Sequence, residues 1–442
     1  MSDKEPGEWI FGLGYDDTLL AESRHPLKEE LDAVSTSHPI FILHISGHMG
    51  VANSLALKLL EDEVKKDEVK PEYYVKNFNE QPTGLLLEDA VFLPLNKATG
   101  FSVSQLATLL ESAVHEYAAQ GFTTVQNGAA DQRYIDGLRF ASLLGLVPQR
   151  LVVWPMDGQL SDAERKGLLK KNTEKFQLGA IKVLVDGSIQ GYTGYLSEPY
   201  HKVPSHMGLH AMEADYRGAP LIARSKLVEI VKGYFEQGQP LAIHGNGDAA
   251  IDDILFAVEQ AVESFPDFDH RTVLVHAQMA RRDQLRTMKA IGVTPSFFSA
   301  HTYYWGDRHR DIFIGEQRGS KISPAKSAER LGLNYSIHLD SPVVPINSMR
   351  LLWTAVTRES SSGRVIGRSE RITREQALRA ITINAAHQIF KEDKIGSIEV
   401  GKFADLTVLD KDPSGKSVDL LSVKVERTYV GGLEIYRHDA LN

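Results

Sequence analysis

Residues 240–252 read PLAIHGNGDAAID, and this stretch shows the unit from which most of the chain is built. The apolar run from Pro240 to His244 is typical of a short buried strand, and the glycines after it indicate a turn. We expect Asp248 to be the N-cap of the helix that follows. Before Pro266 ends the run, apolar residues recur at helical spacing: Ile251, Ile254, Leu255, Val258 and Val262. The stretch therefore predicts a strand, a turn and a helix whose apolar face covers a sheet.

The same pattern occurs seven times, which predicts an α/β fold with parallel strands. Seven strands are awkward for a (β/α)8 barrel, and the eighth should precede Phe122. We therefore predict a TIM-like (β/α)8 barrel that is incomplete at its N-terminus, with its first strand missing. The seven predicted strands are residues 122–126, 150–155, 180–185, 240–244, 272–276, 293–298 and 334–338.

The two ends of the chain do not show this strand-turn-helix pattern. Residues 39–43 (PIFIL) are a candidate for the missing strand, but residues 55–69 read as a charged helix and the stretch to Pro94 as loop-rich. We predict that residues 1–95 form an insertion-like segment and that residues 96–390 form the barrel. Short β-like pieces with turn glycines follow, so residues 391–442 are expected to form a small β-sandwich subdomain.

Composition excludes several functions. The 442 residues include no cysteine, so a thiolate ligand and a cysteine nucleophile are ruled out, and any metal must be held by His, Asp, Glu or a modified Lys. The net charge of -9 opposes binding to nucleic acid or anionic lipid. Residues 1–9 lack the features of a signal peptide, and no long apolar run follows. We expect a cytoplasmic protein with no nucleic-acid or membrane partner.

Four residues that can bind a metal stand at or near the ends of predicted strands: Lys182, His244, His276 and Asp340. Barrel enzymes place their active sites at the C-terminal ends of the strands, so these side chains should converge there. Imidazole at such a position suits zinc, manganese or ferrous iron.

Each residue also has a structural interpretation. Lys182 could pair with a carboxylate such as Asp186, or it could be neutral and take up carbon dioxide to become a carbamate that bridges two cations. Either histidine alone would more often be structural, but two on consecutive strands in the same relative place favour a site. Asp340 could cap a turn before Ser341-Pro342, or it could bind the metal and shuttle a proton from water to the leaving group.

Taken together, these motifs resemble the amidohydrolase superfamily, and within it the YtcJ-like group classed as amidohydrolase family 3. The resemblance runs from about Trp9 to the C-terminus. Its most specific part is the Gly-Ser-x-x-x-Gly-Lys-x-Ala-Asp-Leu run that begins at Gly396. The segments with the resemblance are SGHMGVANSLAL (46–57), AIKVLVDGSIQGYTGYLSEPY (180–200), LAIHGNGDAAID (241–252), VLVHAQM (273–279), PSFFSAHTYYWGDRH (295–309), IHLDSPVVP (337–345) and ITINAAHQIFKEDKIGSIEVGKFADLTVLD (381–410).

The resemblance implies hydrolysis of a carbon-nitrogen bond, most often an amide, by metal-activated water inside a TIM-like barrel. It implies that Lys182 matches the lysine that can be carboxylated, that His244 and His276 are metal ligands, and that Asp340 is both ligand and proton shuttle. His48, Asn53, His301 and His338 match positions around the site, where substrate contact and structural hydrogen bonding are both open. Tyr303, Tyr304 and Trp305 would wall the pocket or pack in the core.

One family feature is absent from the sequence. Family members have a barrel strand ending in His-x-His ahead of this region, whereas here His44 and His48 are spaced His-x-x-x-His and match a later segment. We expect a divalent metal with zinc favoured, as one or two ions. The chain could be a truncated form or incomplete gene model of an active hydrolase, a natural short form, or a non-catalytic binding or regulatory relative. Deamination would use the same residues. The expected partner is a small amide-like molecule, and a homodimer is compatible with the sequence.

Overall fold

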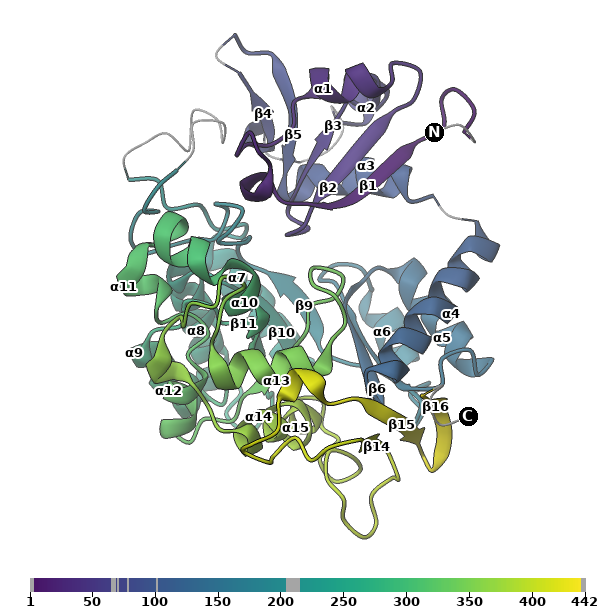
Figure 1. The fold of residues 1–442 in the computed structure, drawn as a ribbon, viewed down its shortest axis with the longest axis vertical. Helices are drawn as coiled ribbons and strands as arrows, with labels where there is room; N and C mark the ends of the chain where they lie inside the picture. Colours follow the sequence, from purple (N-terminus) through teal and green to yellow (C-terminus); the bar gives the residue numbers. More distant parts are fainter. Residues whose placement is uncertain are drawn as a thin grey trace.

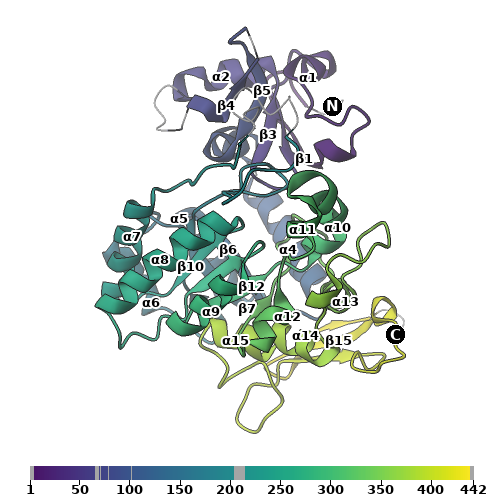
Figure 2. The same cartoon turned by 90° about the vertical axis from the view of Figure 1, so that its left-hand side faces the viewer.

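The main domain is built on two parallel sheets, one of five and one of three strands. Both can be followed in Figures 1 and 2. The computed structural model describes residues 4–64, 69, 71–77, 79–100, 102–203 and 215–438. The strands are β6 (Thr124–Ala130), β7 (Arg150–Pro155), β8 (Phe176–Leu178), β9 (Ile181–Leu184), β10 (Leu241–Gly245), β11 (Val273–His276), β12 (Thr294–Phe297) and β13 (Ser336–Ile337). β8 pairs with β7 and β9 pairs with β10, so these two short strands continue one another across Gly179 and Ala180.

Each predicted strand is present in the structure, and β7 has the predicted bounds, residues 150–155. The bounds of the other strands differ. β6 spans Thr124–Ala130 where residues 122–126 were expected, β13 spans only Ser336–Ile337 where residues 334–338 were expected, and β8 was not predicted. Among the described residues, no hydrogen-bonded ladder joins β13 to β6. The missing first strand remains a prediction.

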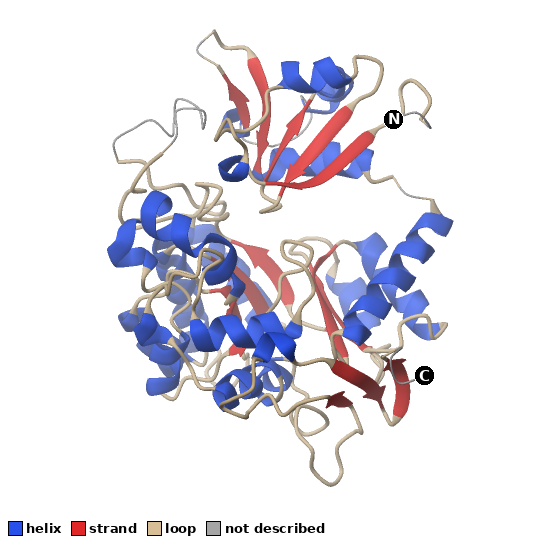
Figure 3. Cartoon of the chain, in the orientation of Figure 1, coloured by secondary structure: helices blue, strands red, loops and turns tan. Residues whose placement is uncertain are grey.

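Helices cover the outside of these strands (Figure 3). α7 (Arg224–Glu236) and α8 (Asp248–Ser264) bury Leu227, Val231, Ile251 and Ile254 against the strands, as the apolar spacing predicts. Every residue of β10 is buried, as is usual for a parallel strand covered on both faces. The other helices of this domain are α4 (Val103–Ala119), α5 (Gln132–Leu143), α6 (Asp162–Leu169), α9 (Arg282–Ile291), α10 (Ala300–Arg308), α11 (Gly315–Gly319), α12 (Ala325–Arg330), α13 (Ser348–Thr357), α14 (Arg374–Ile381) and α15 (Ile383–Gln388).

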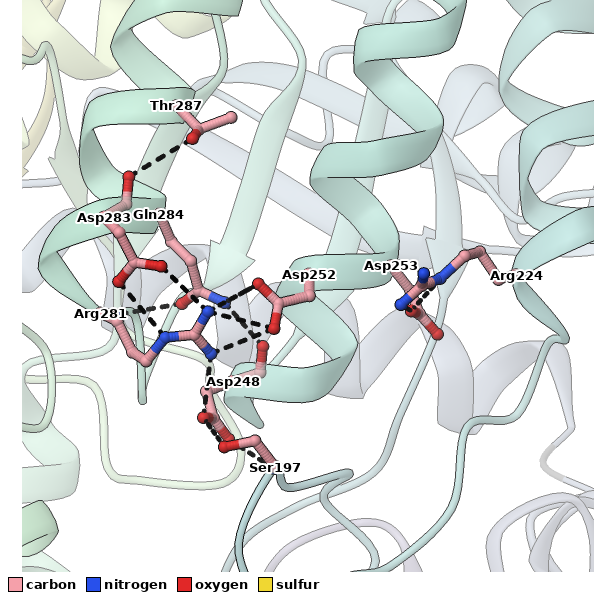
Figure 4. A network of polar contacts seen from close by, with 9 residues as sticks. All are labelled: Ser197, Arg224, Asp248, Asp252, Asp253, Arg281, Asp283, Gln284 and Thr287. Atoms are coloured by element: carbon pink, nitrogen blue, oxygen red, sulfur yellow. Dashed lines mark hydrogen bonds and ion pairs between the residues drawn. The ribbon is translucent and has the colours of Figure 1, made fainter.

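Asp248 corrects one prediction. It is the first residue of α8 rather than its N-cap, which is Gly247. Its carboxylate accepts hydrogen bonds from Ser197 and from Arg281, and Arg281 also pairs with Asp252 and Asp283 (Figure 4). A carboxylate in the first turn of a helix also suits the helix dipole. The network ties the loop after β9 and the loop after β11 to the start of α8.

The N-terminal segment forms a sheet of its own, which lies above the strands in Figure 1. The expected strand at residues 39–43 exists as β2, but it pairs in this sheet and not in the barrel wall. The stretch expected to be loop-rich contains β4 and β5. The sheet order is β1 (Ile10–Tyr15), β2 (Ile40–His44), β3 (Met49–Ala52), β5 (Pro82–Leu87) and β4 (Tyr74–Lys76), with α1 (Lys28–Val34), α2 (Ser54–Val64) and α3 (Phe92–Ala98) beside it. Of the predicted helix at 55–69, residues 65–68 lie outside the described residues.

The C-terminal segment forms a three-stranded antiparallel sheet: β14 (Leu406–Leu409), β15 (Val425–Val430) and β16 (Leu433–Arg437). Gly431 and Gly432 both have positive φ, 61° and 82°, which a tight two-residue hairpin turn requires. Thr428 of β15 donates a hydrogen bond to the carbonyl of Ala118 in α4 at 2.7 Å. The predicted domain boundaries at 95 and 390 remain predictions. No helix in the described part of the chain is long and apolar enough to cross a membrane.

Candidate active site

The predicted ligands lie in or just after strands of the five-stranded parallel sheet. Lys182 is in β9, His244 in β10 and His276 at the end of β11, while Asp340 follows β13. The rings of His244 and His276 are 4.6 Å apart between centroids. Because adjacent parallel strands are in register, equivalent positions meet at one edge.

Three side chains form a group with ligand geometry: His276, His338 and Asp340. One ligand atom of each lies within 4.8 Å of the others. His338 Nε2 is 3.1 Å from His276 Nδ1, and His338 Nδ1 is 2.9 Å from the Ser296 hydroxyl. His338, expected at a substrate-contacting position, thus lies among the candidate ligands.

Two members of this group have unusual backbone conformations. His276 has a φ of 71° and Asp340 a φ of 60°, in the left-handed region that residues other than glycine rarely adopt. Such strain costs about 1–3 kcal/mol per residue and gathers at functional sites. The strain therefore favours a functional role for both residues.

Asp186 organises the neighbouring loops. It does not pair with Lys182, which was one sequence interpretation, but accepts backbone hydrogen bonds from Tyr195, Asn246 and Gly247 at 2.8–3.0 Å. Its Oδ1 is 3.6 Å from His244 Nε2. Burial raises the pKa of Asp186 to about 7, although these hydrogen bonds oppose the shift. In the sequence, the sign of this role is the pair Asp186-Gly187 directly after the predicted strand 180–185.

Lys182 is buried. Burial lowers its pKa to about 8, and the negative charge of Asp340 opposes this shift. A lysine with so low a pKa is partly neutral near physiological pH, as carbamate formation requires.

The buried imidazoles of the site favour the neutral state. Burial lowers the pKa of His244 and of His276 well below the usual value, and the Lys182 charge adds to both shifts. Burial also lowers the pKa of His338 to about 3. Neutral imidazole is the form that binds metals, so these residues fit a cation site. Burial raises the pKa of Asp340, and Lys182 opposes that shift.

The other predicted site residues divide into two sets. His301 lies beside His276, with ring centroids 6.0 Å apart, and Trp305 lies 5.9 Å from His301. By contrast, Asn53 is completely buried in the N-terminal sheet. Its side chain accepts from the backbone of Ile40 and Ala56 and donates to the carbonyls of Ser35 and His38. The structure does not bring Asn53 to the cluster, so the structural interpretation fits it.

Tyr303 stands apart as well. Its ring packs against Trp353 and beneath the guanidinium of Arg350, 4.3 Å from the ring centre. Tyr304 lies edge-on to Tyr303. These contacts agree with the packing alternative for both tyrosines.

A second group with suitable donor types is Asp16, Asp17 and His44. Asp16 accepts hydrogen bonds from Trp305 at 3.1 Å and from Arg308 at 2.7 Å, and His44 Nε2 lies 3.2 Å from Asp17. Arg308 offsets one of the two carboxylate charges of this group, and its own positive charge opposes the binding of a cation there. We assign it a structural role in joining the N-terminal sheet to α10.

What we call the strand-end cluster consists of Lys182, His244, His276, His338 and Asp340. Near it lie buried polar atoms without a hydrogen-bond partner in the described part of the chain. His301 Nδ1 and the side-chain oxygens of Asn246 and Gln278 are buried and have no hydrogen-bond partner among the described residues. A buried polar group without a partner costs about 1–3 kcal/mol unless a ligand or water satisfies it. The donor set, the neutral imidazoles and these atoms together fit a divalent cation with its water and substrate.

Comparison with known proteins agrees with this geometry. The model of the amidohydrolase family matches residues 2–436. N-substituted formamide deformylase of Arthrobacter pascens is 30% identical over 445 residues, which cover 98% of this chain and 79% of that protein. YtcJ of Bacillus subtilis (strain 168), named as an amidohydrolase, is 25% identical, with 97% of this chain and 80% of that protein covered.

Solved structures agree on the fold. A metal-dependent hydrolase from Pyrococcus horikoshii OT3 superposes with a TM-score of 0.70 at 22% identity, over 94% of this chain and 79% of that chain. This likeness supports a TIM-like α/β fold. The chain belongs to the amidohydrolase family, in its YtcJ-like family 3 group.

Proposed function

We propose that this chain is a metal-dependent hydrolase of carbon-nitrogen bonds in small amide-like molecules. The observation that carries the proposal is the group His276, His338 and Asp340 at the strand ends, with ligand atoms within 4.8 Å of one another. Membership of the amidohydrolase family and similarity to N-substituted formamide deformylase support the same reaction class.

The candidate ligands are His276, Asp340, His244 and His338, and zinc is the favoured ion because imidazole and carboxylate suit it. Lys182 would add an anionic oxygen ligand as a carbamate, formed from its neutral amine and carbon dioxide with loss of one proton. A divalent cation held there would polarise the substrate carbonyl and increase the acidity of a water molecule.

Asp340 would act as the proton shuttle. Its pKa is raised by burial, which makes the carboxylate a better base than one in water. It would take a proton from the attacking water and deliver it to the leaving nitrogen, so that the C–N bond breaks to give a carboxylic acid and an amine. His48 and His301 flank the cluster and would contact the substrate.

Hydrolysis of an amide panel by the zinc-loaded full chain tests this proposal. The panel should include N-substituted formamides, because the relative from Arthrobacter pascens is named for them. We expect turnover by the wild type and a loss of about 10²–10⁴-fold in kcat for Asp340→Asn, the usual contribution of a general acid-base.

Asp269→Asn is the matched control, since this side chain is 66% exposed and pairs with Arg271 at the surface. It should leave kcat unchanged. Metal binding without turnover of any amide would contradict the proposal and favour a binding or regulatory protein, and release of ammonia from ring amines alone would favour a deaminase.

A further inference from the structure

Glu88 lies directly after β5 of the N-terminal sheet, and its side chain forms a hydrogen bond with His48, whose ring lies beside the strand-end cluster. His48 lies just before β3, and its ring centroid is 5.4 Å from that of His244. His48 Nδ1 lies 2.8 Å from Glu88 Oε2 and donates to it. The backbone N–H of Glu88 donates to the carbonyl of His48, also at 2.8 Å. Two bonds thus fix the pair at the end of the β3–β5 ladder.

This arrangement has a cost at Glu88. The residue has a φ of 44°, its side chain is buried, and its Oε1 has no hydrogen-bond partner among the described residues. Both a left-handed backbone and a buried unsatisfied carboxylate oxygen reduce stability. The hydrogen bond from His48 to the Glu88 carboxylate is the interaction that offsets these costs.

Gly187, in the loop after β9, makes room for this carboxylate. A Cβ built on Gly187 would overlap Glu88 Oε1 and Thr193 Oγ1. The carbonyl of Gly187 also lies 3.2 Å from His244 Nε2. Glu88 therefore reaches the same loop that supports a candidate metal ligand.

We propose that Glu88 is a positioning residue that fixes His48 with its proton on Nδ1 and presents Nε2 to the amide substrate. A histidine whose one nitrogen donates to a carboxylate has a defined tautomer and ring orientation. The N-terminal sheet then supplies a substrate contact to a site built at the strand ends. This inference rests on the proposed hydrolytic function.

A double-mutant cycle on the zinc-loaded full chain tests the role of Glu88. Glu88→Ala should lower kcat/KM by about 10–100-fold, by analogy with the loss of a carboxylate behind a metal-bound histidine. Glu88→Gln keeps an acceptor oxygen at the same reach and should lower it less. If Glu88 acts through His48, adding Glu88→Ala to His48→Ala should change kcat/KM by no more than about twofold.

Glu80→Ala is the matched control. Glu80 lies in the same part of the chain and also has a positive φ, 60°, but its side chain is 76% exposed. It should leave kcat/KM unchanged. If Glu88→Ala lowers kcat/KM by the same factor with and without His48, the positioning role is wrong.

A second measurement does not depend on turnover. With histidine-selective 15N labelling, and with His48→Ala used for assignment, the ring of His48 should show a protonated Nδ1 in the wild type and lose that signature in Glu88→Ala. An unprotonated Nδ1 in the wild type would overturn the inference even in an active enzyme. If no amide is hydrolysed, the proposed function fails while this signature still reports on the contact.

Discussion

Removing Asp405 should destabilise the protein strongly, although it lies in the C-terminal motif and not in the candidate active site. Its two carboxylate oxygens accept from Arg150 Nε at 2.6 Å and from Nη2 at 3.0 Å, and the backbone of Gly431 donates to it at 2.8 Å. The two side chains are only 9% and 3% exposed, and the Arg150 guanidinium also lies over Phe403, 4.1 Å from the ring centre.

Asp405→Ala would leave the Arg150 charge buried without its partner. Breaking a buried ion pair costs about 3–5 kcal/mol, so the free energy of unfolding should fall by that amount. Urea unfolding followed by circular dichroism measures the change. The double substitution Asp405→Ala with Arg150→Met should lose less than the sum of the two single losses, because no unpaired charge is left.

The control is Glu229→Ala, which breaks the ion pair with Lys226 at the surface of α7, where the side chains are 68% and 64% exposed. It should cost no more than about 0.5 kcal/mol. If Asp405→Ala costs as little as this control, the argument that the motif aspartate joins the barrel to the C-terminal sheet is wrong.

Three further predictions concern pH, the domain junction and the lysine. His338 has its pKa lowered by burial to about 3 from an ordinary 6.5, so the unfolded chain binds this proton at a higher pH than the folded chain does. Between about pH 6.5 and about pH 3 the metal-free protein should lose about 1.4 kcal/mol of unfolding free energy per pH unit at this residue, and His338→Gln should reduce the slope of unfolding free energy against pH by that amount; an unchanged slope would contradict the shift. Arg308→Ala leaves buried Asp16 without its cation and should speed hydrogen exchange in β1 and β2. Arg310→Ala, which removes a 27% exposed side chain paired with Asp311 and Glu316, should not; equal exchange in both variants would refute the structural role. Lys182→Ala should lower metal retention and activity, and millimolar acetate or formate should restore part of both; a fully active variant would exclude a carbamate ligand.

The main-domain strands were predictable because each is a short apolar run closed by a turn, which is a local signal. Residues 150–155 were predicted to the residue. The N-terminal sheet was not predictable in the same way. β5 begins with Pro82 and contains Gly84, both poor strand formers, and it gains its place by pairing with β3, which lies about thirty residues earlier. Such non-local pairing leaves no periodic trace in β5 itself.

The residues of the candidate site also divide into those that the sequence could place and those that it could not. Parallel strands bring equivalent positions to one edge, so His244, His276 and Asp340 could be placed together from their spacing. Glu88 could not, because its contacts with His48 and with the loop at Gly187 join segments that are far apart in the sequence. Asn53 has a site-like sequence context but uses its amide to hold backbone groups.

Zinc-edge anomalous diffraction from crystals of the zinc-loaded chain tests the central claim most directly. The account predicts a strong peak about 2.0–2.2 Å from ligand atoms of His276 and Asp340, with His244 or His338 completing the site. A peak only at Asp16, Asp17 and His44, or none under conditions that support hydrolysis, would contradict it.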